Sequence, residues 1–78
     1  MVEQVKDDMV QVETAVISCV NAEQLLSAYN LVDSLETKYG HLKKKKKTRW
    51  LYESIEQFVM HQRTRISMLM HKQLTEKQ

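Results

Sequence analysis

Apolar residues recur along most of this chain at spacings of three and four residues, which is the period of one face of an α-helix. The first apolar stripe consists of Val2, Val5, Met9, Val12, Val16 and Cys19. The second consists of Leu25, Tyr29, Val32, Leu35 and Tyr39. The third consists of Leu51, Ile55, Phe58, Val59, Gln62, Ile66, Leu69, Met70 and Leu74. The pattern predicts an all-α fold, a single domain 1–78 with helices over about 2–19, 22–39 and 49–75.

The break between the first two predicted helices depends on Asn21. Asn is a favoured N-cap residue, and Gln24 stands at the third helical position, where its side chain can reach back to the cap. Val20 and Leu25 occupy the positions of a hydrophobic staple. The alternative is one continuous helix through an exposed Asn21, which makes the chain a two-helix hairpin.

The connection to the third helix is predicted to be a basic loop over 41–48. Gly40, the only glycine, is placed to end the second helix as its C′ residue. Thr48 is placed to cap the third. The third helix would then be about 40 Å long and the first two about 26 Å each. Because a lone three-helix bundle leaves the end of the long helix without a partner, we expect a homodimer that covers it.

Composition narrows the class of protein. Proline is absent, and with a single glycine the chain lacks the turn residues of a β-rich fold. The one cysteine, Cys19, excludes an internal disulfide and suits a reducing compartment. No apolar run approaches the roughly 20 residues that cross a bilayer, and the acidic start shows no signal peptide. We therefore expect a cytoplasmic protein and no membrane partner.

Charge is divided sharply at Gly40. Residues 1–40 carry seven acidic and two basic side chains, whereas residues 41–78 carry ten basic and three acidic ones. The overall charge of +2 hides this division. The basic half begins with five consecutive lysines, Lys43–Lys47, followed by Arg49 and Trp50.

The lysine run is a candidate contact for a polyanion or an acidic partner. Cations around the free N–H groups at the start of a helix favour an anion, and Trp50 and Tyr52 can stack on a base or lie at a membrane interface. The predicted contact residues are Lys43, Lys44, Lys45, Lys46, Lys47, Arg49, Trp50, Arg63 and Arg65. The alternatives are a solvated loop that binds nothing, an acidic protein surface or an anionic membrane.

A second, weaker stripe follows the third helix through Trp50, Gln57, Met60, Thr64, Ser67, Met68 and His71. Methionine is common on surfaces that accept partners. We therefore predict an oligomer or partner face at Met60, Thr64, Met68 and His71. The alternative is that Met60 and Met68 fill gaps in the core.

Metal binding and catalysis are not expected. His61 and His71 have no Cys, His or carboxylate four residues away, and no CxxC pair is present. The chain has no glycine-rich phosphate loop, no nucleophile elbow and no paired-carboxylate motif. The sequence thus predicts no catalytic residues, no metal and no cofactor.

Two functional classes remain. The first is a small non-catalytic regulator or adaptor that acts by protein–protein contact through a helical-bundle surface, as a homodimer with a further protein partner. The second is a nucleic-acid-binding protein that contacts phosphates through Lys43–Lys47 and the third helix. We favour the first because the net charge is small and the acidic half repels phosphate.

Overall fold

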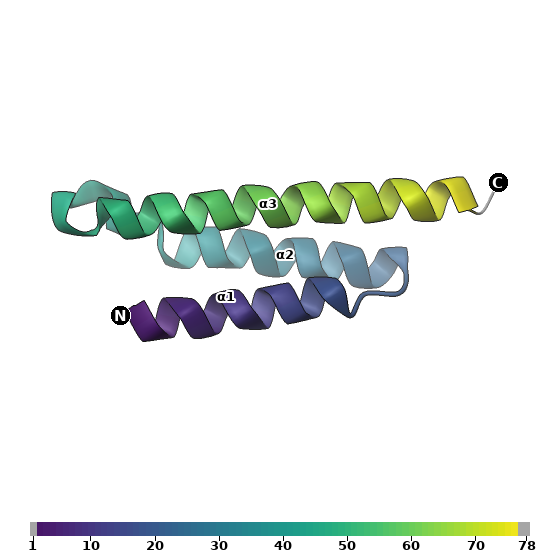
Figure 1. Cartoon of the computed structure of the whole chain (residues 1–78), viewed down its shortest axis with the longest axis horizontal. Coiled ribbons are helices and arrows are strands. Elements are labelled where there is room, and N and C mark those ends of the chain that lie inside the picture. The colour runs from purple at the N-terminus through teal and green to yellow at the C-terminus, as the bar shows by residue number, and fades with distance from the viewer. Residues whose placement is uncertain (1, 77–78) are drawn as a thin grey trace.

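The computed structural model describes residues 2–76 as a bundle of three helices. The elements are α1 (Val2–Ile17), α2 (Ala22–Lys38), the short 3₁₀ helix η1 (Gly40–Lys44) and α3 (Lys46–Glu76). Figure 1 shows that α1 and α3 run in the same direction and that α2 runs antiparallel to both. The predicted all-α architecture, with a long C-terminal helix, is confirmed.

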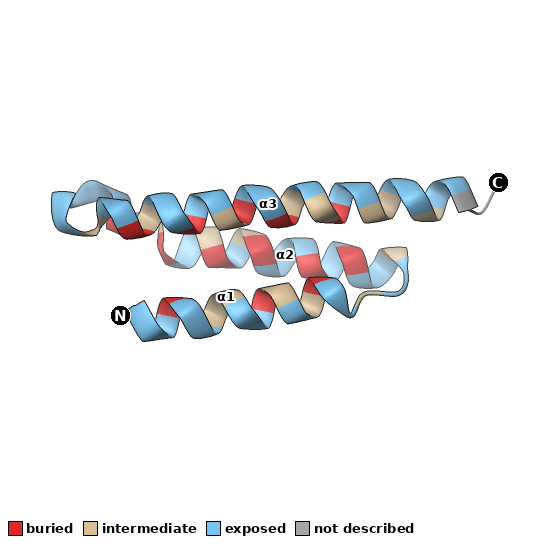
Figure 2. Cartoon of the chain, in the orientation of Figure 1, coloured by how far each residue is buried: buried red, intermediate tan, exposed pale blue. Residues whose placement is uncertain are grey.

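The core lies where the apolar stripes face one another. Figure 2 shows the buried positions on the sides of the helices that meet. The buried apolar residues are Val5, Val12, Val16, Leu25, Ala28, Val32, Leu35, Tyr39, Leu42, Leu51, Ile55, Val59 and Ile66. The polar Gln62 is also buried, and its amide oxygen has no hydrogen-bond partner within residues 2–76. A buried unpaired carbonyl of this kind costs about 1–3 kcal/mol.

Three predicted core residues lie at the surface. The side chains of Val2, Tyr29 and Leu74 are 52%, 38% and 65% exposed. In α2 the small Ala28 takes the buried position, and the Tyr29 ring stays at the edge, where the guanidinium of Arg63 lies 5.8 Å from its centroid. The stripe of α2 is therefore displaced by one residue at this turn.

Asn21 caps α2, so the continuous-helix alternative is wrong. Its backbone is extended, and its Oδ1 accepts a hydrogen bond of 2.9 Å from the N–H of Gln24. The side chain of Gln24 in turn accepts the N–H of Val20 at 2.7 Å. Val20, the first residue of the predicted staple, is 76% exposed, whereas Leu25 is fully buried. The two hydrogen bonds of this capping box mark the helix boundary.

The predicted loop over 41–48 is wrong, because η1 and the first turn of α3 occupy it. Gly40 begins η1 with an ordinary negative φ, so it does not end α2 in a left-handed conformation. Leu42 is buried and anchors η1 to the core. Thr48 does not cap α3. It lies inside the first turn, and its hydroxyl donates to the carbonyl of Leu42 at 2.7 Å. This bond ties η1 to α3.

Because α3 is longer than α1 and α2, it extends beyond them, and its two ends have different surroundings. With 31 residues α3 is about 46 Å long, and α1 and α2, with 16 and 17 residues, are about 25 Å. Since η1 packs against α3, it covers the first turns of the long helix. The other end of α3 projects past the α1–α2 turn (Figure 1).

Charged side chains join all three helices. Asp8 of α1 accepts hydrogen bonds from Tyr39 and from Lys38, the latter at 2.9 Å. Arg63 of α3 contacts Asp33 at 2.5 Å and Glu36 at 3.3 Å on α2. Arg65 lies 3.8 Å from Glu13 of α1. Such partly exposed pairs set the orientation of the helices more than they stabilise them.

Loss of the Asn21 cap should destabilise the bundle. We expect Asn21→Ala to lower the free energy of unfolding by about 0.5–2 kcal/mol, because the N–H of Gln24 loses its acceptor. Asn30→Ala, at an exposed position within α2, is the matched control and should be neutral or stabilising. Chemical denaturation measures both, and a gain in stability for Asn21→Ala would contradict the cap.

The contact between Asp8 and α2 predicts a dependence of stability on pH. The hydrogen bonds from Tyr39 and Lys38 lower the pKa of Asp8 below its ordinary value of 3.8. Because the folded pKa is depressed, this contact stabilises the bundle above pH 3.8, and its contribution is lost as the pH falls through the folded pKa.

We therefore expect the stability difference between wild type and Asp8→Asn to be largest near pH 6 and to shrink as the pH falls below 4. Urea unfolding across this range measures the difference. Asp7→Asn is the control, since Asp7 is exposed and has no ion pair within residues 2–76. A difference for Asp8→Asn that does not vary with pH would show that the contact is not formed in solution.

Candidate functional site

Two exposed surfaces carry most of the predicted contact residues. The first, here called the basic end, comprises Lys43–Lys47, Arg49 and Trp50. The second, here called the outer face, comprises Gln57, Met60, Thr64, Met68 and His71 on the side of α3 away from the core. The basic end lies at the junction of η1 and α3, and the outer face lies further along α3.

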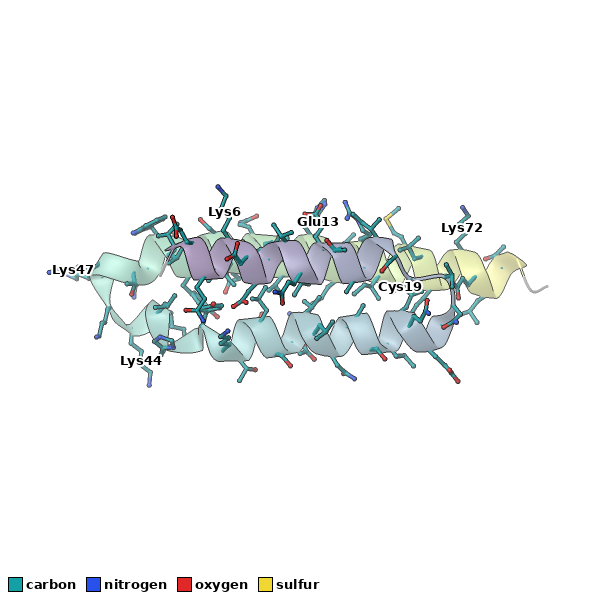
Figure 3. All side chains as sticks on the ribbon, turned by 90° about the horizontal axis from the view of Figure 1, so that it is seen from below. Lys6, Glu13, Cys19, Lys44, Lys47 and Lys72 are labelled. Atoms are coloured by element: carbon teal, nitrogen blue, oxygen red, sulfur yellow. The ribbon has the colours of Figure 1, made fainter. Side chains whose placement is uncertain are left out.

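The fold itself directs the lysines of the basic end into solvent. The run spans the end of η1 and the start of α3, at one end of a molecule 49 Å long and 17 Å by 14 Å across. Leu42 turns inward on one side of the run and Thr48 is bonded to its carbonyl on the other. All five lysines and Arg49 are exposed, and Figure 3 shows Lys44 and Lys47 pointing away from the bundle.

Ion pairing divides the predicted cations into two groups. Arg63 and Arg65 are only 34% exposed and contact acidic side chains of α2 and α1. Lys43–Lys47 and Arg49, by contrast, make no ion pair within residues 2–76. Arg63 and Arg65 are therefore occupied by contacts within the bundle, whereas the cations without an ion pair are concentrated at the basic end.

Aromatic rings lie close to these cations. Trp50 is 58% exposed, and the ammonium of Lys43 lies 5.9 Å from the centroid of the half-buried Tyr52 ring. An open hollow of about 310 Å³ on the Tyr52 side is lined by Lys43, Arg49, Tyr52, Glu53 and Glu56. Because two carboxylates share this hollow, the strongly positive surface ends there.

The outer face is apolar at its centre. Met60 and Met68 are 59% and 68% exposed. The alternative that they fill core gaps is therefore wrong. That role belongs to Met9 and Met70, which are half-buried and packed against the core. The hydroxyl of Thr64 donates to the carbonyl of Met60 at 3.0 Å, so this threonine does not need water to satisfy its donor. An open hollow of about 280 Å³ lies beside Met68 and Thr64.

A groove between α1 and α2 was not predicted. Its hollow of about 400 Å³ is lined mainly by small side chains, including Ala15, Ser18 and Ser27. A second hollow, of about 220 Å³, lies between the same helices and shares Leu31, which is 47% exposed. The sequence feature that marks this groove is the group of small residues. A search for apolar stripes does not detect it, because small residues count neither as apolar nor as polar positions.

Cys19 borders this groove and is a poor nucleophile. It is half-buried, and its thiol donates to the carbonyl of Ala15 at 3.0 Å. Burial raises the pKa of Cys19, which keeps the protonated form at neutral pH. A protonated thiol is neither a good nucleophile nor a metal ligand.

Residues 2–76 present neither a metal-binding cluster nor a transmembrane segment. No three His, Cys, Asp or Glu side chains in this range gather where they could hold an ion. No helix in the same range is apolar over the length needed to cross a bilayer.

The lysine run should oppose the stability of the unliganded protein. Lys46 and Lys47 lie in the first turn of α3, whose positive end repels cations. We expect replacement of Lys44, Lys45 and Lys46 by Gln to retain helicity and to raise the melting temperature at low salt. Heparin should stabilise the wild type but not this variant. A thermal melt with and without heparin decides the matter, and a wild type that gains nothing from heparin would show that the run is only a solvated surface.

The chain matches no known family model, and no curated protein and no solved structure is similar to it at a significant level. What it binds must therefore be inferred from its own side chains.

Proposed function

We propose that this protein is a small non-catalytic regulator or adaptor of the cytoplasm that acts by protein–protein contact through the outer face of α3. The observation that supports this most strongly is the exposure of Met60 and Met68. Both are more than half exposed on a helix whose opposite side is packed against the rest of the bundle.

The chemistry of the outer face suits a protein partner. Unbranched Met side chains adapt to a partner surface and bury large apolar area on contact. The hydroxyl of Thr64 is already bonded to the helix backbone, so burial would leave it satisfied. His61 and His71 lie near the two methionines and supply a polar rim. An apolar centre within a polar rim is the usual organisation of a protein interface.

The first partner that we propose is a second copy of the chain. A 78-residue domain buries only about 60% of its unfolded surface and gains from association. The projecting end of α3 also remains uncovered by the other helices (Figure 1), and Met68 of the outer face, near this end, is 68% exposed. A homodimer on α3 would bury apolar surface that the monomer exposes.

A second candidate function is nucleic-acid binding at the basic end. The specific observation in its favour is that six exposed cations there lack ion pairs within residues 2–76, beside an exposed Trp50. Phosphates would meet the lysines, and the indole ring could stack on an unpaired base. This surface is separate from the outer face, so an adaptor could use both at once.

Salt dependence separates these two functions. Nucleic-acid binding should weaken with a logarithmic slope of about 0.9 per neutralised phosphate on duplex DNA. Binding by the outer face should respond little to salt, because its centre is apolar. Fluorescence anisotropy with duplex and single-stranded probes at two salt concentrations measures the slope. Absence of binding at low salt would remove the second candidate.

Charge on the outer face should abolish the proposed contacts. We expect Met60→Glu/Met68→Glu to retain wild-type helicity and to lose self-association, because it places carboxylates in an apolar interface. Asn30→Glu, which introduces the same charge at an exposed position of α2, is the control and should behave as wild type. Light scattering at micromolar concentration and affinity capture of partner proteins provide the two readouts. Identical behaviour of all three proteins in both would overturn the proposal.

A further inference from the structure

The residues of the outer face are arranged symmetrically about Thr64. Met60 and Met68 lie four residues to either side of it, and Gln57 and His71 lie seven residues to either side. These spacings of three and four keep all five on one face of α3, opposite the buried Gln62 and Ile66. The two methionines are therefore placed identically in either direction along the helix, whereas Gln57 and His71 exchange positions.

Such a face is complementary to itself when two copies run antiparallel. Across a two-fold axis, residue i of one copy meets residue j of the other, and j meets i in return. We propose that the homodimer forms by antiparallel packing of α3 on α3, with the two-fold axis at Thr64. This inference rests on the proposed function and adds the partner's orientation and register.

The side chains that would meet in this register suit one another. Met60 would pack on Met68 of the second copy, at two equivalent places. Thr64 would pack on Thr64 of the second copy through its methyl group, since its hydroxyl is bonded to the carbonyl of Met60. At the edges, Gln57 would lie beside His71 of the second copy, and the amide and the imidazole can exchange a hydrogen bond.

Electrostatics selects the antiparallel orientation over a parallel one. Parallel pairing in register would place the two Lys43–Lys47 runs side by side, with no acidic residue paired to them within residues 2–76. In the antiparallel register, the two Lys47 residues are separated by about 50 Å along the helices. This separation far exceeds the Debye length of about 8 Å at physiological salt, so the two runs do not repel each other.

The register also determines where the two basic ends lie in the dimer. It places one basic end at each end of the assembly, facing away from the other. A dimer of this form would hold two anionic segments about 50 Å apart, and binding of the first would raise the effective concentration of the second.

Cysteine cross-linking tests the register residue by residue. In a Cys19→Ser background, we would introduce a single cysteine as Thr64→Cys, Met60→Cys or Met68→Cys, with Asn30→Cys on α2 as the control. A disulfide forms only where the two Cα atoms approach within about 7 Å. Circular dichroism would check that each variant retains its helicity, and mild oxidation followed by non-reducing electrophoresis would report covalent dimers.

The antiparallel register predicts a distinct pattern. Thr64→Cys should cross-link to itself at micromolar concentration. Met60→Cys and Met68→Cys should cross-link weakly alone, because identical positions lie about 12 Å apart along the axis, and efficiently when mixed. Asn30→Cys should remain monomeric on the gel.

Two other results would overturn the inference, and they are distinguishable. If light scattering gives a dimer but all three positions on α3 cross-link alone, or none does, then the proposed homodimer stands and the register is wrong. If light scattering gives a monomer at every concentration, the homodimer of the proposed function fails together with its register.

Discussion

The inner face of α3 is the surface on which the rest of the molecule is assembled. Leu51, Ile55, Val59 and Ile66 are buried along it, against residues from α1, α2 and η1. Because one side of α3 packs against the core, its opposite side must face solvent. The exposure of Met60 and Met68 follows from the burial of the residues opposite them.

The same packing explains the basic end. Leu42 must reach the start of α3 to enter the core, and the bond from Thr48 to its carbonyl holds it there. The residues between them are the five lysines, which have no inward position to occupy. Burial of Leu42 thus leaves the five lysines exposed at one end of the bundle.

The three helices and the boundary at Asn21 could be predicted from the sequence, because a helical stripe and a capping residue are local signals. The connection after α2 could not. Leu42 stands three residues after Tyr39 and continues the stripe, but it is a lone apolar residue before five lysines and reads as part of a polar loop. Ala28 is buried in place of the predicted Tyr29. This choice depends on the distance between the helices, which cannot be read from the spacing of apolar residues.

The sequence predicted which cations belong to the candidate site, but it did not predict which of them form ion pairs. The sequence shows how many cations there are, yet only the packing of α3 on α2 and α1 places Arg63 beside Asp33 and Arg65 near Glu13. These contacts join residues about 30 and 50 positions apart, so no local pattern encodes them. Once formed, they leave the lysine run as the main uncompensated charge among the described residues.

Methionine methyl NMR with a soluble paramagnetic probe shows whether the outer face of α3 is a contact surface. In dilute protein the probe should broaden the methyl signals of Met60 and Met68 strongly and those of the half-buried Met9 and Met70 less. As the concentration of protein or of a partner rises, the signals of Met60 and Met68 should become protected while those of Met9 and Met70 change little. Broadening of Met60 and Met68 that stays the same under all conditions would show that the outer face is not a contact surface.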